Sequence, residues 1–205
     1  MERCLDEVLI AQFHLRFGRT ALEAQIYWPS RPLLPVAAPL VVLLADEARL
    51  DSADLLGRGL SASADAVVLR VPDRAQCLAA LMWAADHAHE LGGQRDRLMV
   101  AGCGVSGARA TRLATIARDN RWPVLQRQVL VHPRFTSACP RPQRVVGVAA
   151  ATIVSGNGPR DEAGRYAARL RRAGVEVIEL RQRDDDETQL IAVLARSWQT
   201  KGSIA

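Results

Sequence analysis

The stretch from Leu98 to Ala110 constrains the fold of this chain more than any other. It begins as a short apolar run, breaks at Gly102 and Gly104, and continues as an alanine-rich helical pattern. A buried apolar run that passes sharply into a helix is typical of a parallel strand and the helix that follows it. The stretch therefore predicts a strand, a tight turn and a helix at the centre of an α/β fold.

The rest of the chain alternates in the same way. Two strand-like runs come first, at 8–15 and 21–28, and the turn between them predicts a hairpin. Further strands are expected at 40–45, 66–71, 128–131, within 145–154 and at 175–180, and helices at 51–63, 73–91, up to about 119, 161–173 and 187–198. This order predicts a three-layer α/β/α sandwich, a mostly parallel sheet of about eight strands with an N-terminal antiparallel hairpin, formed by a single domain over residues 1–205.

Composition excludes several classes of protein. A chain of 205 residues with 49% hydrophobic content can bury one substantial core. The net charge of +5 comes almost wholly from scattered arginines, which favours a solvated surface over nucleic-acid binding. No apolar run is long enough for a membrane span, and the acidic N-terminus does not resemble a signal peptide. We expect a cytoplasmic protein without a cofactor.

The cysteines and histidines give no sign of a metal or disulfide site. The cysteines are widely separated, which indicates reduced thiols; they are Cys4, Cys77, Cys103 and Cys139. Structural or surface roles are expected for His14, His87, His89 and His132. The acidic run at 184–187 lacks the spacing of a calcium loop, so we interpret it as a solvated loop that caps the last helix.

The central turn has the spacing of a nucleophile elbow, G-x-S-x-G, but without its serine. With Gly102 as the first glycine, the nucleophile position falls on Gly104 and the second small position on Ser106. Cys103 could be a displaced nucleophile, but Val105 would then be a bulky neighbour, so a buried structural thiol is the favoured interpretation. Ser106 is interpreted as a small residue where helix packs on strand.

Several segments together resemble the bacterial hormone-sensitive-lipase-like esterases of the α/β hydrolase fold. They are AVV at 66–68, WAADHAHELGG at 83–93, DRLMVAG at 96–102, QVLVHP at 128–133 and PRDEAGRYAARLRRAGVEV at 159–177. The last segment is the most specific, because it resembles the helix that follows the catalytic acid of that family. The resemblance implies the α/β hydrolase fold over most of the chain.

The same resemblance implies that the catalytic groups have been replaced. Ester hydrolysis needs a nucleophile, an acid that orients a base, the base itself and donors for the oxyanion. The first three positions fall on Gly104, Asn157 and Glu187. The oxyanion loop falls on 45–48, which reads Ala45, Asp46, Glu47 and Ala48. We therefore expect a degenerate member of the family with no intact catalytic residue.

The resemblance also implies that the substrate cap is missing. The tyrosine- and proline-containing loop of the family has no equivalent after 66–71, and only seven residues separate Phe135 from Gln143 where the family has a long insertion. No room remains for N-terminal cap helices. An open face at the carboxyl ends of the strands follows from these losses.

The leading hypothesis is a catalytically inactive homologue, a pseudo-esterase that acts as a protein-interaction or scaffolding subunit. Its partner would be another protein or a second copy of this chain, since an uncovered apolar face favours association. The first alternative is a binding or receptor-type protein for a small apolar ligand. The second is a carboxylic-ester hydrolase with residual or altered activity that uses Cys103 or Ser106.

Overall fold

A single β-sheet runs through the computed structural model, which describes residues 8–30, 38–46, 50–74, 76–156, 161–181, 191 and 194. Within these residues the strands are β1 (Leu9–Phe17), β2 (Thr20–Trp28), β3 (Ala38–Ala45), β4 (Val67–Pro72), β5 (Gly93–Cys103), β6 (Arg127–Val131), β7 (Ala150–Ser155) and β8 (Val177–Arg181). The helices are α1 (Leu50–Ala64), α2 (Cys77–Asp86), α3 (Gly104–Asn120) and α4 (Glu162–Arg172).

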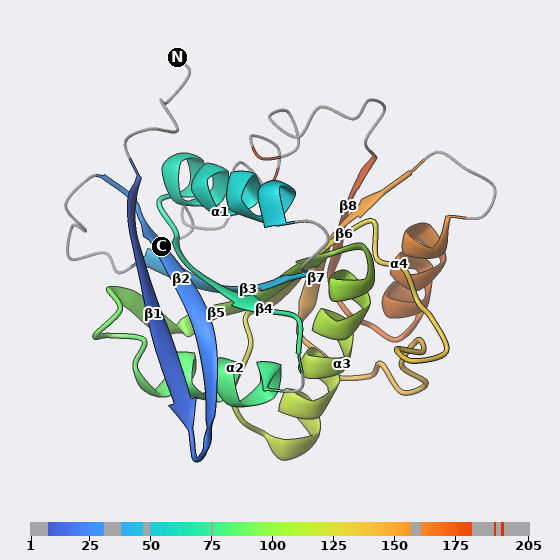
Figure 1. The fold of residues 1–205 in the computed structure, drawn as a ribbon. Helices are drawn as coiled ribbons and strands as arrows, with labels where there is room; N and C mark the ends of the chain where they lie inside the picture. Colours follow the sequence, from blue (N-terminus) through green and yellow to red (C-terminus); the bar gives the residue numbers. More distant parts are fainter. Residues whose placement is uncertain are drawn as a thin grey trace.

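The strands are ordered β1-β2-β4-β3-β5-β6-β7-β8 across the sheet (Figure 1). Strands β1 and β2 form the antiparallel hairpin, and β2 pairs antiparallel with β4. All pairs from β4 to β8 are parallel. The predicted fold is confirmed, including the hairpin at the start of a mostly parallel sheet.

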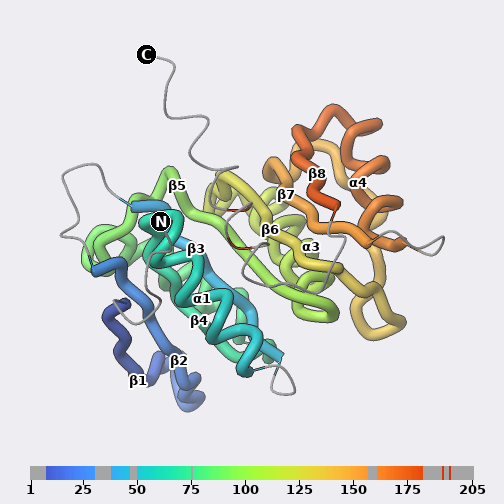
Figure 2. The backbone as a smooth tube through the Cα atoms, turned by 90° about the horizontal axis from the view of Figure 1, so that it is seen from above, coloured from blue at the N-terminus to red at the C-terminus, as the bar shows by residue number. Residues whose placement is uncertain are grey.

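Helices cover both faces of this sheet, so the domain has three layers (Figures 1 and 2). One core lies between the sheet and α2, α3 and α4, and a second lies between the sheet and α1. All eight residues of β3 are buried, as expected for a central parallel strand. The predicted helix at 187–198 lies outside the described residues except for Ile191 and Leu194, which are helical and buried in the α1 core.

Several predicted boundaries were wrong, and the helix predicted over 73–91 also ends early, at Asp86. Helix α2 begins at Cys77 rather than at residue 73, because the N–H of Asp73 donates to the carbonyl of Ala45 and keeps the chain at the sheet edge. Strand β5 begins at Gly93 rather than Leu98, since its first residues also pair with β3 ahead of a shift in register.

Helix α1 was predicted to span 51–63. The helix already begins at Leu50, so Asp51 lies within its first turn. A carboxylate there still favours the helix through the N-terminal end of the dipole. No helix in the described part of the chain is both long enough and apolar enough to cross a membrane.

Candidate functional site

The turn between β5 and α3 has the geometry expected of an elbow. Strand β5 ends at Cys103, and α3 begins at Gly104, whose φ is +57°. Glycine adopts this left-handed conformation without a steric penalty. A Cβ built on Gly104 would meet no other heavy atom within 4 Å, so the tip of the turn faces open space.

Two further glycines allow α3 to pack directly against the end of β5. A Cβ on Gly102 would lie 2.5 Å from the carbonyl oxygen of Ser106. A Cβ on Gly107 would lie 2.9 Å from the carbonyl oxygen of Gly102. Both contacts are to backbone atoms, which cannot move aside easily. The predicted strand, turn and helix are confirmed, and these glycines are needed for their packing.

Ser106 does not point toward the open tip of the turn. Its side chain is fully buried, and its hydroxyl donates a hydrogen bond of 2.8 Å to Oδ2 of Asp73. The other carboxylate oxygen of Asp73 forms an ion pair with Arg109 on the next turn of α3. We call Asp73, Ser106 and Arg109 the Asp73 network. Ser106 thus lies where α3 packs on the sheet, and the network ties the end of β4 to α3.

The thiols differ in their access to solvent. Cys103 is only partly buried, so its predicted full burial was wrong; it lies at the last position of β5, where the sheet ends. Cys77 and Cys139 are buried. Burial raises the pKa of the Cys77 thiol to about 11 and also raises the pKa of Cys139. Neither buried thiol supplies a thiolate at neutral pH.

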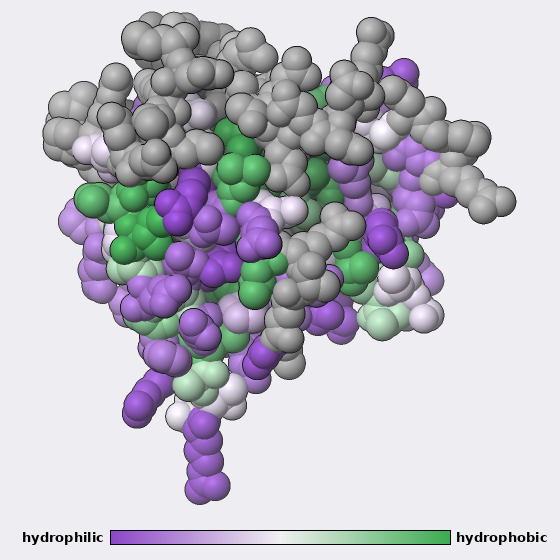
Figure 3. Space-filling view, turned by 45° about the horizontal axis from the view of Figure 1, so that its top comes forward, coloured by the Kyte–Doolittle hydropathy of each residue, from purple (hydrophilic) through white to green (hydrophobic). Residues whose placement is uncertain are grey.

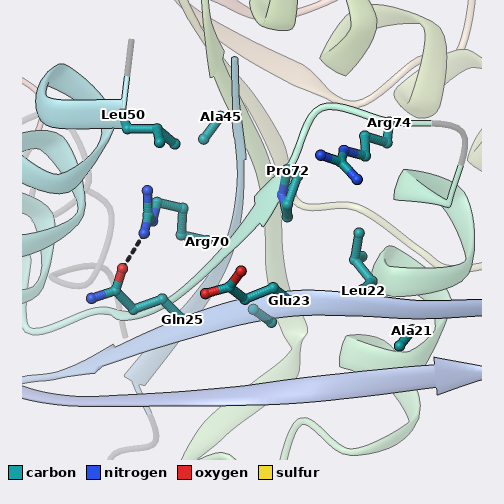
Figure 4. A pocket seen from close by; sticks show the side chains of 10 residues that line it. Ala21, Leu22, Glu23, Gln25, Ala45, Leu50, Arg70, Pro72 and Arg74 are labelled. Carbon is teal, nitrogen blue, oxygen red and sulfur yellow. Dashed lines mark hydrogen bonds between the residues drawn. The ribbon is translucent and has the colours of Figure 1, made fainter. Parts of the chain in front are cut away.

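A pocket of about 370 Å³ lies on the α1 face of the sheet, beside the ends of β3 and β4 (Figure 4). Arg70 projects into it from β4 and Glu23 from β2, with Leu50 of α1 opposite. We call it the Arg70 pocket; it is lined by residues 21–25, Ala45, Leu50, Arg70, Pro72 and Arg74. Its charged side chains were not selected from the sequence as a site.

Comparison with known proteins agrees with this geometry. A family described by the alpha/beta hydrolase fold matches residues 70–154. Carboxylesterase NlhH of Mycobacterium tuberculosis is 31% identical over 131 residues, which are 57% of this chain and 40% of that protein. The chain is thus similar to esterase/lipase-like α/β hydrolases. It spans well under half the length of the curated relatives that it matches.

Solved esterase structures share the fold. An arylesterase structure superimposes with a TM-score of 0.81 at 18% identity, covering 94% of this chain and 84% of that one. The esterase LipW from Mycobacterium marinum gives 0.77 at 22% identity, with 93% and 81% covered. A hyperthermophilic esterase from Pyrobaculum calidifontis gives 0.80 at 18% identity, with 94% and 85% covered.

Several positions that the esterase resemblance marks lie outside the described residues. These are Asn157, Glu187, Glu47 and Ala48, together with the acidic run at 184–187. Ala45 is buried at the end of β3 and Asp46 follows it, half-buried. The assignment of acid, base and oxyanion positions stays a prediction.

His87 takes part in side-chain packing, and His132 takes part in a backbone hydrogen bond between strands. His87 stacks on Trp83 with 4.5 Å between ring centroids, and its Nδ1 lies 2.9 Å from the Trp83 carbonyl oxygen. The N–H of His132 donates to Val154 next to it in the sheet. Among the residues described, no three His, Cys, Asp or Glu side chains are grouped in a way that could hold a metal.

Sequence reasoning missed Asp73 and Arg70. Asp73 follows a buried strand directly, which is where functional side chains of parallel sheets gather, and this signal could have identified it. Arg70 interrupts the apolar run of β4 between Leu69 and Val71. A charged residue within a buried strand is expected to contact a polar partner inside the protein.

Proposed function

We propose that this chain is a catalytically inactive esterase homologue that acts by binding, as a protein-interaction or scaffolding subunit. The main support is Gly104. It occupies the tip of the turn between β5 and α3, at φ +57°, where the elbow of an esterase presents its nucleophile. Acyl transfer at this point would need a side-chain oxygen or sulfur, and glycine has neither.

Neighbouring groups are poorly suited to replace the missing nucleophile. Ser106 is fully buried, and its hydroxyl is already engaged by Asp73. Cys77 and Cys139 are buried, and their raised pKa values keep them as neutral thiols. These facts favour a role that does not depend on hydrolysis.

Ester hydrolysis with an altered nucleophile is the second candidate. It is favoured by the names of the matched relatives, which are carboxylesterases and esterases. Cys103 is the group that would then react, because it is partly exposed and directly precedes Gly104 at the tip of the turn.

An assay with short-chain p-nitrophenyl esters separates the two candidates. The purified protein should hydrolyse these esters no faster than buffer alone does. The Gly104→Ser variant should also be inactive if the base and the oxyanion donors are missing. Turnover that disappears in Cys103→Ala and persists in Ser106→Ala would refute the inactive role and establish the second candidate.

The binding role needs its own test. The exposed large hydrophobic residues of the described chain are spread over several segments: Leu9, Leu50, Met82, Val124 and Val146. On the face shown in Figure 3, apolar residues form separate areas between polar ones. Native mass spectrometry of the protein purified from its own cells should show a dimer or a complex; a monomer without a copurifying protein would contradict a scaffolding role.

A further inference from the structure

We propose that the Arg70 pocket binds a small organic carboxylate with a short apolar body. This site lies on the α1 face of the sheet and contains no residue of the elbow or of the Asp73 network. Binding at this pocket does not depend on whether the protein hydrolyses esters.

Strand pairing fixes where Arg70 points. Arg70 on β4 lies opposite Gln25 on β2 in the antiparallel register, and its Nη2 donates to Oε1 of Gln25. Alternate residues of a strand face the same side, and Tyr27 of β2 is buried in the α1 core, so Gln25 and Arg70 share that side. The guanidinium is thus held in place inside the pocket by a neutral partner.

The Arg70 guanidinium retains an unused donor. Its Nε is buried and has no hydrogen-bond partner among the described residues. Leaving a buried donor unpaired is unfavourable, so a ligand that supplies an acceptor is stabilised there. Guanidinium groups bind carboxylates especially well, because two parallel hydrogen bonds match the two oxygens.

Among the described residues, no neighbouring carboxylate forms an ion pair with Arg70. Asp54 is already occupied, since it accepts a 2.7 Å hydrogen bond from Tyr27 and forms a 2.6 Å ion pair with Arg58. Glu23 lines the pocket, but no ion pair joins it to Arg70 within the described residues.

The remaining walls suit an apolar group. Leu50, Ala45 and Pro72 line the space opposite and beside the guanidinium (Figure 4). A pocket of about 370 Å³ is at the small end of the range for ligand sites and has room for a short-chain acid. A ligand carboxylate could pair with the Arg70 guanidinium while its alkyl chain packs against these apolar residues.

Isothermal titration calorimetry with butyrate, butyramide and inorganic phosphate at constant ionic strength tests the proposal. Butyrate should bind with a dissociation constant in the millimolar range, and the neutral butyramide should bind much more weakly. Arg70→Gln should weaken butyrate binding by about tenfold, because it removes the charge and the paired donors. Arg112→Gln, an exposed site on α3 at the opposite face, is the matched control and should leave binding unchanged.

A second variant distinguishes loss of the binding group from a folding defect in Arg70→Gln. Glu23 is exposed, so Glu23→Gln should fold normally, and it should tighten butyrate binding by about threefold because it removes a repelling charge. Opposite shifts in the two variants would support the proposal. Equal binding of butyrate and butyramide, no effect of either variant, or tight binding of phosphate without butyrate would each overturn it.

Discussion

At Gly104 the turn between β5 and α3 carries no side chain at its tip. The backbone there has φ +57°, and a Cβ would meet nothing within 4 Å. A serine would therefore fit in the available space, but it would have to adopt the left-handed conformation that only glycine takes without strain. Glycine avoids that strain at this position.

Gly104→Ser should lower the free energy of unfolding by about 1 kcal/mol because of this backbone strain. Gly104→Asn is the matched control, since asparagine tolerates left-handed φ better, and its loss should be smaller. Urea unfolding followed by circular dichroism measures both. Unchanged or increased stability of the serine variant would show that the turn does not require glycine.

Cys77 and Cys103 should react very differently with iodoacetamide. Cys77 is buried and its pKa is raised to about 11, so at about pH 8 it is almost wholly a neutral, inaccessible thiol. Cys103 is partly exposed and should be alkylated first in the folded protein. Peptide mass spectrometry after timed quenching identifies the modified site. Equal rates at the two cysteines would contradict the described burial.

At the scale of elements, the Asp73 network fixes α3 against the loop that follows β4. The Asp73 side chain is 7% exposed, and it binds Ser106 and Arg109 on successive turns of the helix. Its own N–H donates to the end of β3. One residue thus connects two strand ends to the helix that begins at the elbow.

Asp73→Ala should lower the free energy of unfolding by about 2 kcal/mol, because the buried hydroxyl of Ser106 loses its acceptor and Arg109 loses its ion pair. Asp73→Asn retains an acceptor oxygen and should lose less. Thermal and urea unfolding of the two variants give the comparison. An Asn variant as unstable as the Ala variant would mean that charge, rather than hydrogen bonding to Ser106, holds the network together.

The contact of α3 with β5 leads to a prediction at Gly107. Gly107→Ala would place a Cβ 2.9 Å from the Gly102 carbonyl oxygen and should cost about 1 to 3 kcal/mol, since backbone must shift. Gly156→Ala is the matched control, because nothing lies within 4 Å of its Cβ, and it should be nearly neutral. The melting temperatures of the two variants are compared with that of the unchanged protein. A Gly107→Ala variant with an unchanged melting temperature would show that α3 can move away from β5 freely.

At the scale of the whole molecule, burial of neutral acids on both sides of the sheet links stability to pH. Burial raises the pKa of Cys77 to about 11 and of Tyr166 to about 12, and it also raises the pKa of Tyr27. The unfolded chain releases these protons at lower pH than the folded chain does. Their contribution to stability is therefore complete below the ordinary thiol value of 9.0 and is lost as the pH rises through the folded values.

The free energy of unfolding should accordingly fall above pH 9.0, by about 1 kcal/mol per pH unit for each proton that the unfolded state has released. Urea titrations at increasing pH measure this decline. Cys77→Ala should show a shallower decline between the ordinary and the raised thiol value. Stability that is constant or increasing over this range would be inconsistent with the burial of these groups.

The sequence alone predicted the element order, the hairpin, the parallel sheet and the strand-turn-helix at 98–110. These features depend on local periodicity and on glycine, and both can be read along the chain. It also placed Gly104 at the tip of the turn, where the structure shows a left-handed φ. The boundaries of α2 and β5 were missed because hydrogen bonds to distant strands set them.

Only the tertiary structure decided which polar side chains meet. Ser106 binds Asp73 across 33 residues, and Arg70 binds Gln25 across 45 residues. Such pairs depend on strand order and register, which the crossovers of the sheet determine and no local pattern records. The strand, turn and helix at 98–110 could therefore be recognised from the sequence, whereas the Asp73 network and the Arg70 pocket follow from the packing of the three layers.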